Sequence, residues 1–155
     1  MSQDESSRAE PIVVEETFAA DRSDVWKAVT ELDQLRQWFF DCIPEFRAEP
    51  GFETRFTIDT GEREFPHVWR IVEAVEAEDQ HRLVIDWSYE NYDGKGLVIF
   101  ELFDNESSGT DFRVINEGLD TFPENVPEFT WESAFNGWTF LICECLKRHV
   151  DGEIA

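Results

Sequence analysis

The amino-acid sequence predicts an α+β domain in which a curved antiparallel sheet of about six strands wraps around one long C-terminal helix. Three observations predict this fold. Short runs of alternating hydrophobic residues follow one another at hairpin spacing in the middle of the chain. Two short amphipathic segments precede most of these runs, and an apolar stripe at helical spacing lies near the C-terminus. The expected order is therefore β-αα-β5-α.

The N-terminal third supplies one strand and two short helices. Residues 11–18 are hydrophobic on one parity, which predicts the first strand. A helix is expected over about 24–30, with Asp21 or Ser23 as its N-cap. Asp33 is expected to cap the second helix. The two helices should cover one edge of the sheet.

The middle of the chain supplies five more strands, and their boundaries follow from alternation and turn residues. They are expected at 52–58, 67–75, 82–89, 96–103 and 110–117. The segment Asn91–Gly94 predicts the turn between the third and fourth of them. Strands joined by such short turns pair with their neighbours, which favours an antiparallel sheet.

The last segment predicts the long helix. A loop with two prolines spans 118–129. The stripe after it recurs four and three residues apart and consists of Trp131, Phe135, Trp138, Ile142, Cys145 and His149. Such a stripe must be buried, and the sheet is its large partner. Gly137 costs the helix about 1 kcal/mol, so we expect it to permit close approach to the sheet.

Composition and charge limit the function classes. The chain has 155 residues, 41% of them hydrophobic and 14% aromatic, enough for a core without disulfides or metals. Its net charge of −22 repels phosphate backbones and anionic lipids, so neither nucleic acid nor a membrane is an expected partner. Residues 1–10 are polar and expected to be a disordered lead-in, with one domain over 11–152.

The cysteines and the N-terminus favour a cytoplasmic protein. Cys42, Cys143 and Cys145 form no C-x-x-C pair, so reduced thiols are expected. The N-terminal residues include no apolar segment typical of a signal peptide, and no apolar run approaches the ~20 residues that a membrane span needs.

Several local motifs occur together in a characteristic order. They are Phe18-Ala-Ala-Asp-Arg-Ser-Asp-Val-Trp-Lys-Ala-Val-Thr30, Leu35 with Trp38, Pro50-Gly51-Phe52, Arg82-Leu-Val-Ile-Asp-Trp87, Gly109-Thr110 and Gly137-Trp138. Over about residues 12–150 the sequence resembles the SRPBCC (START-like, helix-grip) superfamily. Within it, the chain is similar to the branch of the C-terminal domain of the activator of heat-shock protein 90 ATPase. It departs from that branch at residues 59–64, which are acidic where the family is Gly-rich and often basic.

The resemblance implies a cavity between the sheet and the C-terminal helix. Its wall would come from Trp38, Phe39, Phe56, Trp69, Trp87, Tyr89, Phe100, Phe122, Trp131, Phe135 and Trp138. In one interpretation this wall encloses a small hydrophobic ligand. In the other, the same rings fill the core. A role as a co-chaperone acting on a heat-shock protein 90 ATPase is the alternative function that the family implies.

Residues suited to catalysis are few. His67 shares a parity with Trp69 and Glu101 shares one with Ile99, so each is a candidate acid or base inside the cavity. The competing interpretations are a non-catalytic histidine and a carboxylate that points outward. Related helix-grip proteins include cyclases, dehydratases and hydrolases, which makes an enzyme a third alternative. No phosphate loop, nucleophile elbow or zinc pair occurs, and neither a cofactor nor a metal is expected.

Overall fold

The computed structural model describes residues 10–152, so the expected disordered lead-in at 1–10 lies outside the described residues except for its last position. The strands are β1 (Ile12–Phe18), β2 (Glu53–Asp59), β3 (Glu64–Glu76), β4 (Gln80–Tyr89), β5 (Tyr92–Asp104) and β6 (Thr110–Glu117). The helices are α2 (Arg22–Thr30), α3 (Leu32–Trp38), α4 (Trp131–Phe140), a π-helical segment (Leu141–Leu146) and α5 (Lys147–Asp151). The predicted order β-αα-β5-α is confirmed.

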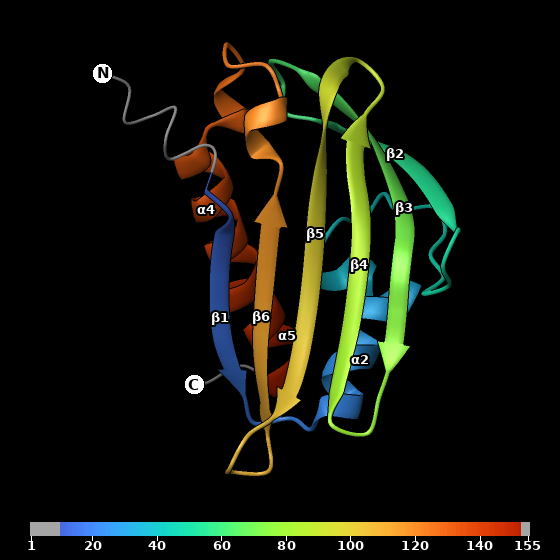
Figure 1. Ribbon diagram of the computed structural model, residues 1–155, viewed down its shortest axis with the longest axis vertical. Coiled ribbons are helices and arrows are strands. Elements are labelled where there is room, and N and C mark those ends of the chain that lie inside the picture. Colours follow the sequence, from blue (N-terminus) through green and yellow to red (C-terminus); the bar gives the residue numbers. More distant parts are fainter. Residues whose placement is uncertain (1–9, 153–155) are drawn as a thin grey trace.

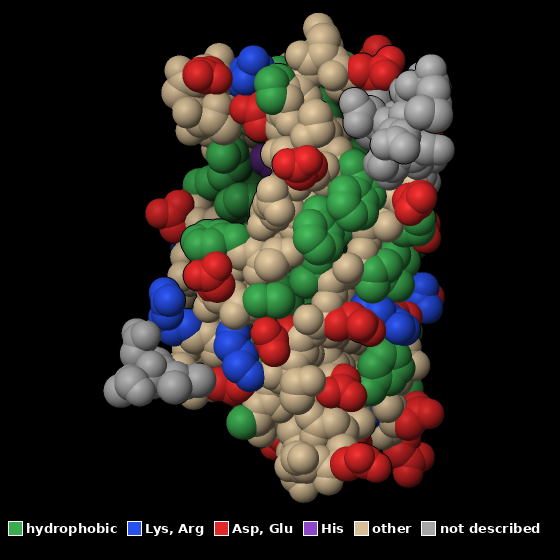
Figure 2. Space-filling view, turned by 90° about the vertical axis from the view of Figure 1, so that its left-hand side faces the viewer, with side chains coloured by type: hydrophobic (Ala, Val, Ile, Leu, Met, Phe, Trp, Pro, Cys, Tyr) green, Lys and Arg blue, Asp and Glu red, His purple; other side chains and the backbone are tan. Residues whose placement is uncertain are grey.

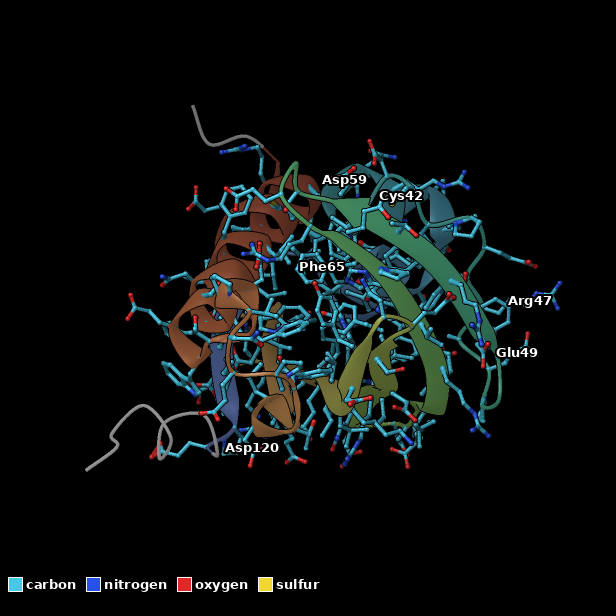
Figure 3. The ribbon with its side chains drawn as sticks, turned by 90° about the horizontal axis from the view of Figure 1, so that it is seen from above. Cys42, Arg47, Glu49, Asp59, Phe65 and Asp120 are labelled. Atoms are coloured by element: carbon cyan, nitrogen blue, oxygen red, sulfur yellow. The ribbon has the colours of Figure 1, made fainter. Side chains whose placement is uncertain are left out.

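The six strands form one antiparallel sheet that curves around the C-terminal helix. Their order across the sheet is β1-β6-β5-β4-β3-β2, so each strand from β2 to β6 pairs with its neighbour in sequence. All helices lie on one face, with α4 and α5 behind β1 and β6 (Figure 1). Seen from above, the sheet forms an arc that partly encloses the helices (Figure 3). The helix-grip prediction is confirmed.

The two short helices follow each other more closely than predicted. Asp21 caps α2, with its carboxylate accepting a hydrogen bond from the Asp24 amide at 2.9 Å. The second helix begins at Leu32 rather than after Asp33, because Glu31 adopts an extended conformation that ends one helix and starts the next. The Trp38 indole N–H donates to the Ala28 carbonyl at 2.7 Å, which ties α3 to α2.

The turn between β4 and β5 is tighter than predicted. Tyr89 pairs directly with Tyr92, so the strand already includes most of the segment Asn91–Gly94. The register shifts just after this pair, where β5 has more residues than β4. Gly94 absorbs the shift with a φ of 120°, and a Cβ there would lie 2.7 Å from the Thr121 carbonyl oxygen. Because Gly94 has no Cβ, the 118–129 loop can lie directly against the sheet.

The buried stripe of the C-terminal helix differs from the predicted one in its second half. Trp138, Ile142 and Leu146 are its buried residues, four apart, whereas the predicted Cys145 and His149 are only half-buried. The π-helical segment explains the difference, because its i→i+5 hydrogen bonds widen the turn and keep residues four apart on one face. No helix within residues 10–152 combines the length and apolarity needed to cross a bilayer.

Candidate functional site

A cavity of about 250 Å³ lies at one end of the molecule, between the sheet, the 118–129 loop and α4. Its wall consists of Phe40, Ile58, Thr60, Phe65, His67, Trp87, Tyr89, Gly96, Asn116, Leu119, Phe122, Glu128, Phe129, Ala134, Gly137, Trp138 and Leu141. Figure 2 shows a hollow in the upper part of the helical side, with hydrophobic side chains around it and a histidine inside. From above, Phe65 lies near the centre of this end, with Asp59 and Asp120 toward its rim (Figure 3).

The wall contains some of the residues expected there, and the others lie elsewhere. The expected residues in the wall are Trp87, Tyr89, Phe122 and Trp138, together with the catalytic candidate His67. Those outside it are Trp38, Phe39, Phe56, Trp69, Phe100, Trp131 and Phe135. Sequence parity places a side chain on a face of the sheet or helix, but it does not say how far along that face the cavity extends.

Rings outside the wall fill the core beneath the cavity. Phe39 stacks on Trp38 with 4.8 Å between ring centroids and lies 5.3 Å from Trp69 and 5.9 Å from Trp138. Phe100 of β5 packs against Phe112 of β6 in the core, with 5.4 Å between ring centroids. The aromatic side chains therefore fill the core along most of the helix and leave space at one end.

Trp131 and Phe135 lie away from the cavity at the beginning of the C-terminal helix. Their rings stack at 5.1 Å and an interplanar angle of 7°. The Trp131 indole donates to the Glu10 carbonyl at 3.2 Å, so this pair anchors the start of the described chain. Both side chains are half-buried and pack against the core.

The segment after α3 and the 118–129 loop supply three wall residues that sequence reasoning missed: Phe40, Leu119 and Phe129. Leu119, Phe122 and Phe129 are buried, although they lie in short 3-10 turns and connecting backbone. Phe122 and Phe129 stack with ring centroids 4.9 Å apart. The sequence did contain a signal for this burial: the loop has three large hydrophobic residues, and exposed loops seldom contain such residues.

His67 is a neutral acceptor in the wall. It is 5% exposed, and its Nδ1 lies 2.7 Å from the Phe65 carbonyl oxygen. A carbonyl only accepts, so Nδ1 is the protonated nitrogen and Nε2 has a free lone pair. Burial lowers the pKa of His67 to about 4, although the hydrogen bond to Phe65 opposes this shift. The imidazole is therefore uncharged at neutral pH.

Tyr89 is the neighbouring polar group. The Trp87 indole N–H donates to its hydroxyl oxygen at 2.9 Å. Burial raises the pKa of Tyr89 to about 12, against the opposite effect of the hydrogen bond from Trp87. The hydroxyl is therefore protonated at neutral pH, and its own hydrogen remains available to the cavity.

Gly137 does not have the role expected of it. A Cβ built at this position meets no atom within 4 Å, so the glycine is not needed for close packing on the sheet. It lies instead in the cavity wall, at an exposed position on α4. At this position the cavity wall is exposed to solvent.

An ion pair joins two segments beside the cavity. Arg63, in the turn between β2 and β3, donates from one guanidinium nitrogen to both carboxylate oxygens of Glu128 at 3.2 Å. Glu128 belongs to the cavity wall and to the 118–129 loop. The two side chains are about one-third exposed, at 31% and 33%. The acidic 59–64 segment thus provides a cation that holds the loop in place.

Glu101 lies outside the cavity, on the opposite face of the sheet. Its neighbours Phe100 and Leu102 point into the core, so alternation turns Glu101 outward. It accepts two hydrogen bonds from Arg113, at 2.9 and 2.6 Å, and is 8% exposed. The structure therefore separates Glu101 from His67. Residues 10–152 contain no cluster of three or more His, Cys, Asp or Glu side chains placed to hold a metal ion.

Known structures show the same fold. A protein from Chromobacterium violaceum is 18% identical with a TM-score of 0.73, over 92% of this chain and 98% of that one. A protein from Mesorhizobium loti is 21% identical with a TM-score of 0.72, over 94% and 100%. The Aha1 dimer from Colwellia psychrerythraea is 14% identical with a TM-score of 0.67, over 94% and 99%.

Family membership follows from the sequence itself. No curated protein sequence matches at a significant level. Residues 19–150 match the family described as Activator of Hsp90 ATPase homolog 1-like protein, which is most of the chain. The chain therefore belongs to the Activator of Hsp90 ATPase homolog 1-like family, within the helix-grip fold.

Proposed function

We propose that this protein binds a small, uncharged, largely apolar molecule in the cavity between the sheet and α4. The cavity carries the proposal, because its wall is mostly aromatic and aliphatic and a few polar groups face into it. A volume of about 250 Å³ suits a molecule of two or three rings rather than a long lipid. Binding would remove apolar surface from water, which is favourable at roughly 25 cal/mol per Å².

The positions of Gly137 and the Arg63–Glu128 pair support the proposal. An exposed glycine inside a helix lowers helix stability by about 1 kcal/mol relative to alanine, and no packing contact explains it here. An opening into the cavity does explain it. The ion pair beside the cavity fixes the loop that supplies Phe122 and Phe129 to the wall.

A variant that fills the opening tests the proposal. Gly137→Leu places a side chain where a Cβ meets no neighbour, so the fold is expected to persist. Titration with naphthalene, followed by tryptophan fluorescence, should show binding to the native protein and at least tenfold weaker binding to Gly137→Leu. Asn136→Leu is the matched control, because it adds the same side chain at an exposed helix position outside the wall. Equal binding by all three proteins, or by none, contradicts the proposal.

A second candidate function is regulation of an Hsp90 ATPase. It is supported by the description of the family and by the Aha1 protein among the structural neighbours. ATP turnover by purified Hsp90, measured with increasing amounts of this protein, tests the idea. An unchanged rate together with no complex on gel filtration contradicts it. Repeating the assay with Gly137→Leu separates a role of the cavity from a role of the outer surface.

A further inference from the structure

His67 and Tyr89 are adjacent polar residues in the cavity wall. They pair across β3 and β4, and their ring centroids lie 4.7 Å apart in an edge-to-face arrangement. Cross-strand partners present their side chains on the same face of a sheet, and both side chains belong to the cavity wall. One ligand group placed beside this pair can therefore reach both of them.

The two residues offer complementary halves of a hydrogen-bonding site. Nδ1 of His67 lies within hydrogen-bond distance of the Phe65 carbonyl oxygen, and its Nε2 makes no hydrogen bond to any group of residues 10–152. The Tyr89 oxygen accepts from Trp87, and its own O–H meets no acceptor within the described part of the chain. The cavity thus contains one unused acceptor and one unused donor side by side. A ligand that covers both groups without pairing them is therefore disfavoured.

A hydroxyl group satisfies both members of this pair through a single oxygen atom, whereas a carbonyl, an ether or a hydrocarbon does not. A hydroxyl donates one hydrogen bond and accepts others at the same time. A carbonyl or ether oxygen accepts from Tyr89 but leaves Nε2 of His67 unpaired. A hydrocarbon leaves both unpaired.

The electrostatic surroundings disfavour an anionic ligand. The described wall contains no lysine or arginine, and its one carboxylate belongs to Glu128. The chain as a whole has a net charge of −22. Burying a carboxylate here would cost its hydration without a cation to compensate.

From these observations we infer that the cavity selects a neutral apolar alcohol or phenol, whose hydroxyl donates to Nε2 of His67 and accepts from the hydroxyl of Tyr89. This inference rests on the proposed function and names the class of its ligand. The apolar body of the ligand occupies the space between Phe122, Trp138 and Leu141.

Four probes of similar size test it by calorimetry: naphthalene, 1-methoxynaphthalene, 1-naphthol and 1-naphthoate. We expect 1-naphthol to bind roughly five- to tenfold more tightly than the methyl ether, the advantage of one donated hydrogen bond. The ether should exceed naphthalene by a similar factor, and 1-naphthoate should bind most weakly. If the ether equals 1-naphthol, or 1-naphthoate binds best, the inference is wrong while the proposed function stands. If none of the four binds, the proposed function itself is contradicted.

Two variants test which residue makes each hydrogen bond to the probe. His67→Phe removes the acceptor, so 1-naphthol should lose its advantage over the ether. Tyr89→Phe removes the donor, so the ether should approach naphthalene, whereas 1-naphthol should keep the advantage of its hydrogen bond to His67. Tyr92→Phe is the matched control, because Tyr92 contacts the same aromatic residues but lies outside the wall. If the ether keeps its advantage over naphthalene in Tyr89→Phe, the inference is wrong even if His67→Phe does not fold.

Discussion

The indole nitrogen of Trp138 donates a hydrogen bond to the side-chain oxygen of Asn116, 3.1 Å away. This bond connects α4 to β6 at the cavity, since both residues belong to its wall. Trp138 is 5% exposed, so its N–H depends on this acceptor. The wall is therefore held by a specific polar contact as well as by packing.

Asn116→Leu is expected to destabilise the protein by about 1–3 kcal/mol, because it leaves the indole N–H without an acceptor. Urea denaturation measures the change. A double-mutant cycle with Trp138→Phe isolates the hydrogen bond from other effects. In the Trp138→Phe background the additional loss from Asn116→Leu should be smaller by about 1 kcal/mol. Strict additivity of the two substitutions would contradict the coupling.

Arg63→Ala is expected to accelerate ligand release. Without the pair to Glu128, the 118–129 loop is less firmly held, and release of 1-naphthol should become roughly fivefold faster. The pair is partly exposed, so global stability should change by less than about 1 kcal/mol. Stopped-flow displacement measures the rate. Arg55→Ala is the control, because it also removes an arginine with two glutamate partners, Glu53 and Glu90, but lies outside the wall.

The sequence patterns predict the sheet and the long helix because burial is periodic in both. In β4, Leu83 and Ile85 are buried on the core face as their parity predicts. β5 is less informative, since Ile99 on its outer face is also buried. A strand that is apolar on both faces gives no alternation, which is why Glu101 could be assigned to either face.

The cavity itself was only partly predictable. Its wall combines strand ends, a loop and a helix, and no periodic pattern relates Phe40 to Phe129. The π-helical segment also shifts the buried stripe from Cys145 to Leu146, and hydrophobicity alone does not reveal such a segment. What the sequence shows is the abundance of aromatic residues, and the three-dimensional arrangement decides which of them leave space.

The contacts of Asp151 lead to a further prediction about the stability of the fold. Its carboxylate accepts hydrogen bonds from the Ala19 and Ala20 amides at 2.9 and 3.1 Å, and pairs with Lys147 at 3.0 Å. Burial acts to raise the pKa of Asp151, but the Ala19 bond, Lys147 and the Ala20 bond together lower it below its ordinary value of 3.8. Asp151→Ala is expected to cost about 1.5–3 kcal/mol at pH 7.

The pH dependence tests the role of the Asp151 charge. A carboxyl group with a lowered folded-state pKa stabilises the fold above its ordinary pKa, and this contribution is lost as pH falls through the lower folded value. The stability difference between the native protein and Asp151→Asn should therefore be constant above pH 5 and shrink below about pH 4. Urea denaturation across this range measures it, and a difference that grows toward acid would contradict the prediction.

The lowered pKa of His67 predicts that stability also depends on pH in a second, higher pH range. Its pKa is lowered from 6.5 to about 4 by burial, so between these values the unfolded chain binds a proton that the folded one does not. Stability should therefore fall by up to about 3 kcal/mol as the pH decreases from 6.5 to 4. His67→Phe should lack this component. Denaturation of both proteins at several pH values measures it, and parallel curves would contradict the lowered pKa.

Ligand binding in the cavity is tested most directly by a map of amide chemical-shift changes as 1-naphthol is added to the ¹⁵N-labelled protein. If the probe binds in the cavity, the largest changes occur at His67, Tyr89, Ala134, Gly137 and Leu141, on both sides of the cavity. Saturable changes confined to the outer face of the sheet, or no saturable changes at all, would contradict it.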